Sequence, residues 1–170
     1  QYLYHLLLVD DVGGVVGHLK THRIRRGVDA ASAPGADAGD IAESWYNAAL
    51  GVDPEYGAAH AGICTVQVGN YFESSDPEQI AAAESSCFRA LELNPTLDVV
   101  HVALGNLYQA TGRHAASMES YRQALRVNPA SVSAMIGLGA VLAQINEPEE
   151  AERLLRRAIG LQPGNWSAYN

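Results

Sequence analysis

The sequence predicts an all-α protein in which helical hairpins stack side by side as a right-handed α-solenoid. Each predicted unit carries two apolar stretches whose spacings of three and four residues are typical of helices. The units also share an ending, Ala-x4-Pro, that recurs in steps of 34 residues at Ala90/Pro95, Ala124/Pro129 and Ala158/Pro163. A fixed period of this length indicates units that cannot bury their apolar faces alone and stack on their neighbours.

The unit 98–131 predicts one helix around Val99 to Ala110 and another around Ala115 to Val127. Gly112 is expected to end the first helix, because glycine readily adopts the left-handed conformation needed there. Pro129 closes the second helix, since the residue before a proline is disfavoured in the helical region. The unit 132–165 repeats this design with Asn146 and Pro163.

The unit 57–97 is seven residues longer, and the surplus lies around 71–76. This insertion predicts a lengthened first helix and a longer loop inside the hairpin. Asp76 and Pro77 predict the start of the second helix, because aspartate caps helix N-termini and proline is favoured at the first helical position.

Upstream of 57 the repeat pattern is incomplete. Residues 38–53 predict only a second helix, whose partner is expected within 14–30, and a linker of small residues at 31–40 joins the two. We therefore divide the chain into an irregular N-terminal helical segment with linker and a solenoid. The ranges are 1–37, then 38–170 with units 38–53, 57–97, 98–131, 132–165 and the start of another at 166–170. The missing Met and this restart indicate a fragment of a longer protein.

These patterns resemble the tetratricopeptide repeat, whose units pair Leu-Gly-x2-Tyr with later small, aromatic and proline positions. Unit 98–131 departs from the pattern at His101 and Ser117, and unit 132–165 replaces the aromatics by Met135, Leu142 and Leu155. The matching residues are Leu104, Gly105, Tyr108, Tyr121, Ala124 and Pro129, then Leu138, Gly139, Ala151, Ala158 and Pro163. Short strings at 62–64, 87–95 and 162–170 also resemble repeat arrays of bacterial multidomain signalling proteins.

The resemblance implies a concave groove lined by the first helix of each hairpin. Val102 and Ile136 stand where some family members place a lysine that clamps a terminal carboxylate, and Asn106 alone matches such a clamp. We therefore expect a non-enzymatic interaction module, a scaffold or adaptor, that binds an apolar peptide or helix of a protein partner. The groove positions are Ala58, Ala61, Thr65, Val68, Val99, Val102, Asn106, Gln109, Ser133, Ile136, Ala140 and Gln144.

The sequence also allows two other classes of function, self-assembly and metal-dependent catalysis. A structural unit could form homo-oligomers through a C-terminal face led by Trp166 and Tyr169. An enzyme with a metal at His18 and His22 is disfavoured, because no Glu follows His18 and a third ligand is not evident. We expect no catalytic residue, no metal and no cofactor. His60 and His101, at one register position of successive units, are interpreted as packing residues.

Charge and cysteines constrain the partner and the compartment. A net charge of -8 opposes nucleic-acid binding, and the apolar N-terminus is too short to span a membrane. The basic cluster Lys20, His22, Arg23, Arg25 and Arg26 is interpreted as a solvated helix face. Cys64 and Cys87 are interpreted as buried free thiols, with a redox pair as the alternative, which favours a reducing, cytoplasmic location.

Overall fold

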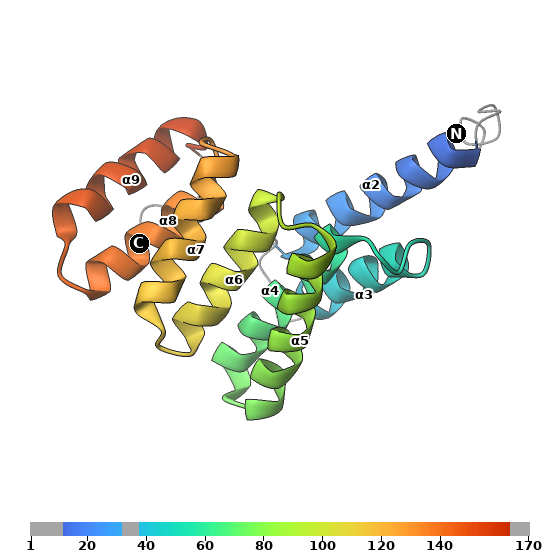
Figure 1. Ribbon diagram of the computed structural model, residues 1–170, viewed down its shortest axis with the longest axis horizontal. Helices are drawn as coiled ribbons and strands as arrows, with labels where there is room; N and C mark the ends of the chain where they lie inside the picture. The colour runs from blue at the N-terminus through green and yellow to red at the C-terminus, as the bar shows by residue number, and fades with distance from the viewer. Residues whose placement is uncertain (1–11, 32–37, 164–170) are drawn as a thin grey trace.

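Helical hairpins follow one another along the chain from α2 and α3 at one end to α8 and α9 at the other (Figure 1). The computed structural model describes residues 12–31 and 38–163, with side chains from residue 21 onward. Within these ranges all regular structure is helical, which confirms the predicted all-α fold. The helices are α2 (Val12–Ala31), α3 (Ala38–Leu50), α4 (Gly57–Ser74), α5 (Pro77–Leu93), α6 (Asp98–Ala110), α7 (His114–Val127), α8 (Val132–Gln144) and α9 (Pro148–Leu161).

The ends of the two regular hairpins lie where the sequence predicts them. Gly112 follows α6 with a φ of 70°, and Asn146 follows α8 with a φ of 65°, so both adopt the left-handed conformation. Just beyond each turn, a backbone N–H bonds back to the preceding helix: Arg113 to Tyr108 and Glu147 to Leu142, at 2.8 and 2.9 Å. These bonds satisfy carbonyl groups that the helix end would leave unpaired.

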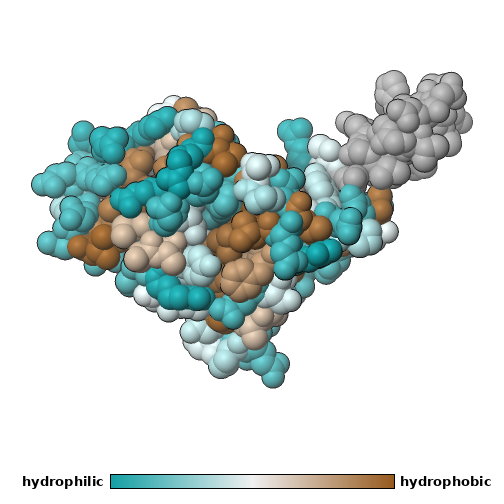
Figure 2. Space-filling view, in the orientation of Figure 1, coloured by the Kyte–Doolittle hydropathy of each residue, from teal (hydrophilic) through white to brown (hydrophobic). Residues whose placement is uncertain are grey.

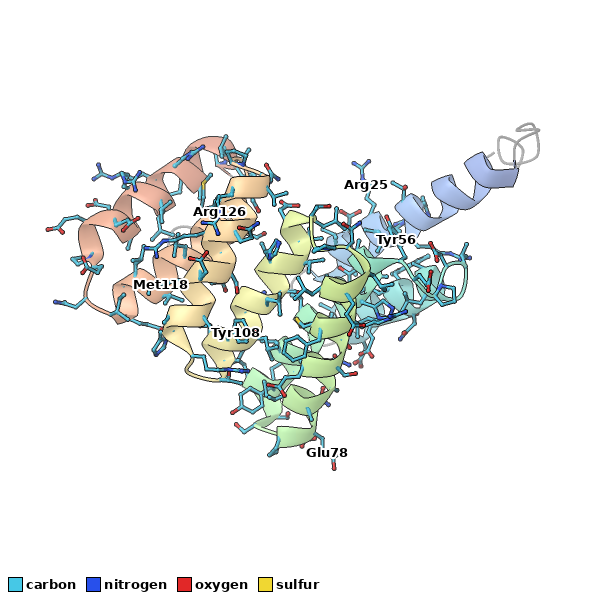
Figure 3. The ribbon with its side chains drawn as sticks, viewed as in Figure 1. Arg25, Tyr56, Glu78, Tyr108, Met118 and Arg126 are labelled. Carbon is cyan, nitrogen blue, oxygen red and sulfur yellow. A yellow bond between two sulfur atoms is a disulfide. The ribbon has the colours of Figure 1, made fainter. Side chains whose placement is uncertain are left out.

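The α4–α5 hairpin uses its extra residues differently from the prediction. The first helix is lengthened as expected, but the predicted longer loop is wrong, because only Ser75 and Asp76 separate α4 from α5. Asp76 accepts a 2.9 Å hydrogen bond from the backbone of Glu78, and this predicted cap starts α5 directly. With 18 and 17 residues the two helices extend beyond their neighbours, and Glu78 lies near the far end of the hairpin (Figure 3).

The N-terminal hairpin pairs α2 with α3, so the partner helix expected within 14–30 is present. Arg23 ties the two helices together by donating a 2.6 Å hydrogen bond to the backbone oxygen of Ala48. Because α3 begins at Ala38, the end of the predicted linker is helical, and residues 32–37 lie outside the described ranges. None of the described helices is both long and apolar enough to traverse a lipid bilayer.

Small residues and one large ring set how closely the helices pack. The side chain of Tyr121 on α7 is fully buried, and a Cβ atom placed on Gly105 of α6 would lie 2.5 Å from its ring. Gly137 of α8 leaves the same kind of space on the other side of the ring. Five alanines of the second helices are buried as well, namely Ala83, Ala90, Ala124, Ala151 and Ala158. The hairpins are thus held by close helix contacts around a few large side chains.

Replacing Gly105 by Ala tests this packing. The new methyl group would clash with the ring of Tyr121, which cannot move away because the backbone of Gly137 lies against its other side. The free energy of unfolding should therefore fall by about 1–3 kcal/mol. Gly69→Ala in α4 is the matched control, because nothing lies within 4 Å of its Cβ position. Alanine there should raise the free energy of unfolding by about 1 kcal/mol. Denaturant titration of both variants measures the difference, and equal effects would contradict the packing described.

Alkaline pH tests the burial of the two core tyrosines. Burial raises the pKa of Tyr46 to about 12 and raises the pKa of Tyr121 further, with the Ser117 hydrogen bond opposing that second rise. In the unfolded chain both would lose their protons near pH 10. Their contribution is therefore complete below pH 10, and above it the free energy of unfolding should fall by about 1.4 kcal/mol per pH unit for each tyrosine. Tyr46→Phe should reduce the change of the free energy of unfolding per pH unit by the contribution of one tyrosine. A free energy of unfolding that does not change between pH 10 and 11 would contradict the burial of these two hydroxyl groups.

Candidate functional site: the first-helix face

The first helices of the hairpins form one continuous layer. In chain order α2 contacts α4, α4 contacts α6 and α6 contacts α8, and the second helices α3, α5 and α7 each pack between the first helices of two hairpins. Within the described ranges, the second helices do not pack on one another in this way: α5 makes no comparable contact with α7, nor α7 with α9. Because the first helices lie closer together than the second helices, the stack curves toward the first-helix layer.

Most of the predicted groove positions have exposed or partly exposed side chains on this layer. Ala61 and Val68 do not, because both are buried in the core between α4, α5 and α6. The other positions define what we call the first-helix face. Its members are Ala58, Thr65, Val99, Val102, Asn106, Gln109, Ser133, Ile136, Ala140 and Gln144.

The two central amides of this face are held by a residue from the second-helix layer. The hydroxyl of Tyr121 donates to Oδ1 of Asn106 at 2.6 Å and lies 3.2 Å from Oε1 of Gln109, so the two oxygens share its proton. Both amide NH₂ groups are then left to donate elsewhere. From the sequence, Tyr121 was predicted only as the aromatic position of the repeat pattern. The signal in the sequence was the pair of glycines, Gly105 and Gly137, which leave space for the ring of Tyr121 to reach the layer of first helices.

The first-helix face is uncharged, because none of its members is an acidic or basic residue. Val99 is the most exposed apolar member at 44%, while the hydroxyl of Thr65 is already donated to the backbone oxygen of Ala61. The surface between the helices can therefore offer amide donors and aliphatic contacts. Figure 2 shows that the side of the stack in view also carries hydrophobic groups around α5 and α6, with mainly hydrophilic groups over α7 and α9.

The two histidines at equivalent register positions make the same hydrogen bond to the preceding unit, and of the two only His101 is buried. Nε2 of His60 lies 2.9 Å from the backbone oxygen of Pro54, and Nε2 of His101 lies 2.8 Å from that of Pro95. Each ring thus reaches back to the proline that closes the preceding unit. Since a carbonyl oxygen only accepts, Nε2 carries the proton in both rings.

The basic cluster on α2 is only partly a solvated face. Arg25 projects from the helix (Figure 3), but the guanidinium of Arg26 lies 5.9 Å from the ring centre of Trp45 and the ring of His22 meets the same tryptophan edge-on. Arg23 is bound to α3 through its backbone contact. The side chains of His18, Lys20, Trp166 and Tyr169 lie outside the described part. In the part that is described, no three metal-ligating residues group together.

The interpretation of the cysteines as free thiols is wrong. Cys64 of α4 and Cys87 of α5 form a disulfide, with their Cα atoms 5.3 Å apart, and neither side chain is exposed. The repeat register predicts core positions on neighbouring helices for both cysteines, but it does not by itself give their relative heights along the hairpin. The residues stand at the same level of antiparallel helices, which is the geometry that a disulfide requires.

Known proteins share both the repeat and the fold. The family model of the tetratricopeptide repeat matches residues 102–165. Anaphase-promoting complex subunit 3 of Schizosaccharomyces pombe is 31% identical over 77 residues, which cover 45% of this chain and 12% of that protein. Protein O-mannosyl-transferase TMTC1 of Homo sapiens is 25% identical over 107 residues, which cover 63% of this chain and 12% of that protein. The chain spans only this small part of both relatives.

Two solved structures are similar over most of the chain. The tetratricopeptide-repeat protein TTC0263 of Thermus thermophilus has a TM-score of 0.66 at 19% identity, and covers 85% of this chain and 75% of its own. PilF of Pseudomonas aeruginosa has a TM-score of 0.64 at 17% identity, and covers 90% of this chain and 65% of its own. The family match shows tetratricopeptide repeats at residues 102–165, and the solved structures show that most of the chain shares the fold of such repeat proteins.

Proposed function

We propose that the chain is a non-enzymatic module that binds an uncharged, largely apolar peptide or helix of a protein partner along the first-helix face. The observation that carries the proposal is the pair of amides on α6. Asn106 and Gln109 have their oxygens engaged by Tyr121, so their NH₂ groups are oriented and available to donate. A bound peptide supplies the matching acceptors through its backbone carbonyl groups.

The surroundings of the amides favour aliphatic side chains on the partner. Val99 and Val102 lie on the same helix as the amides, and Ile136 lies on the neighbouring helix α8, where Val102 and Ile136 also pack on the core beneath. An aliphatic side chain that covers these residues removes apolar surface from water on both partners, which stabilises the complex. A terminal carboxylate would find no cation on the face, so we propose recognition of an internal segment.

The family match supports the class of function without naming a partner. Tetratricopeptide repeats generally mediate protein–protein interactions, and their repeats are typically non-catalytic. A scaffold or adaptor role in bacterial signalling stays a proposal that depends on the strings at 62–64, 87–95 and 162–170. The proposed cytoplasmic location loses its main support, because structural disulfides such as Cys64–Cys87 persist chiefly in oxidising compartments.

Self-assembly is the second proposal for the same chain. Leu161, in the last turn of α9, is 47% exposed, and in the sequence it precedes the predicted contact residues Trp166 and Tyr169, which lie outside the described ranges. Light scattering over a concentration series separates the two functions. A binding module should keep the mass of one chain at every concentration, whereas a mass that rises with concentration would favour assembly.

Peptide selection tests the binding function directly. Peptides selected from a random display library on the intact chain should be apolar, and one selected peptide should bind equally well with a free or an amidated C-terminus. The substitutions Val102→Asp and Asn106→Asp together should weaken its Kd at least tenfold, because two carboxylates replace an aliphatic contact and a donor. Calorimetric titration measures the Kd, and circular dichroism checks that helicity is kept.

A matched variant controls for charge. Ser85→Asp with Ala115→Asp adds the same two negative charges at exposed positions of the second helices α5 and α7. This control should bind like the unmodified chain. If both double variants lose binding equally, or if neither does, the first-helix face is not the binding site.

A further inference from the structure

The disulfide occupies the register positions that glycine and tyrosine hold in the next hairpin. Cys64 is the eighth residue of its unit, as Gly105 is of the following unit. Cys87 lies eight residues before the closing proline of its unit, as Tyr121 does before Pro129. The middle hairpin therefore has a covalent bond where the next one packs a ring against a glycine.

The residue of the next first helix that faces this contact also differs, being alanine where the tyrosine contacts have glycine. Each core tyrosine lies against glycines of two first helices: Tyr121 against Gly105 and Gly137, and Tyr46 against Gly27 and Gly62. Gly62 and Gly137 are both the sixth residue of their units. At the disulfide that sixth position is Ala103, whose backbone oxygen lies 4.0 Å from Sγ of Cys64. The smaller disulfide leaves room for a methyl group that a tyrosine ring would exclude.

The bond lies in the core that joins the two ends of the stack. Both sulfur-bearing side chains are fully buried among residues of α4, α5 and α6, and that cluster lies between the cores of the N-terminal and C-terminal hairpins. In a solenoid each unit contacts only its neighbours. Loss of the central contact would therefore weaken the connection between the two ends.

We propose that the Cys64–Cys87 bond replaces the ring contact of the middle hairpin and makes the stability of that hairpin depend on thiol redox state. A dithiol reductant attacks one sulfur, and its second thiol then resolves the mixed disulfide. The reductant leaves as a cyclic disulfide, and Cys64 and Cys87 become thiols. Because both sulfurs are buried, the hairpin has to open before the reductant can reach them. The proposal is independent of the peptide-binding function.

Thermal unfolding with and without dithiothreitol tests the proposal. Reduction should lower the Tm of the intact chain by about 10 °C, since the bond closes a loop between positions 23 residues apart. Hydrogen exchange in the reduced chain should accelerate in α4 and α5 while α8 and α9 keep their protection. An unchanged Tm, or a uniform loss of protection along the chain, would overturn the proposal.

Rebuilding the ring contact tests the register argument. The triple variant C64G/C87Y/A103G should fold with a Tm that dithiothreitol does not change, whereas C64G/C87Y, which keeps Ala103, should melt lower. Equal Tm values for these two variants would refute the correspondence with Gly105, Tyr121 and Gly137. If neither folds, C64A/C87A decides the redox claim, because its Tm should match that of the reduced chain under both conditions.

Discussion

A ring from a second helix that fills the gap between two glycine-bearing first helices is the contact on which the stack depends. Tyr121 joins α7 to α6 within one hairpin and to α8 in the next, so one side chain sets both spacings. Tyr46 does the same for α2, α3 and α4. Because such a contact involves three helices, a hairpin cannot shift against its neighbour without disturbing its own packing. The solenoid is therefore ordered even though every unit touches only the adjacent ones.

This contact also connects stability to recognition. The ring of Tyr121 is part of the core, but its hydroxyl reaches the first-helix face and binds the amides of Asn106 and Gln109. The orientation of the two donors is therefore fixed by a buried side chain whose own position is fixed by packing. Pre-organised donors bind with less loss of conformational freedom than mobile ones. The face thus gains order from the same residue that holds the hairpins together.

Local signals made much of this fold predictable from the sequence. The period of 34 residues indicated the hairpins, and Gly112, Asn146 and Asp76 indicated helix ends, because turns and caps depend on a few adjacent residues. The turn at Ser75 was not predicted, since the inserted residues continued both helices where a loop was expected. Local sequence does not tell whether an insertion lengthens helices or the loop between them.

The errors at the candidate site, by contrast, have a cause that is not local. Ala61 and Val68 were assigned to the groove by register, but both side chains are buried against residues of α5 and α6. The disulfide was missed because pairing depends on the relative height of two helices, which the apolar pattern of each helix alone does not give. The regular units 98–131 and 132–165 place all their predicted groove residues on exposed or partly exposed positions.

The middle hairpin, α4 and α5, departs from its neighbours in two ways: it has a disulfide in place of the ring contact, and its helices are longer. It lacks the ring contact of the neighbouring hairpins, and its disulfide fills less space than a tyrosine. Its helices of 18 and 17 residues contact each other over a greater length than the 13 and 14 residues of α6 and α7. Longer helices bury additional apolar surface within the hairpin, and the covalent bond reduces the entropy of the unfolded chain. Insertion and disulfide thus supply within the unit what its neighbours obtain from a ring shared between units.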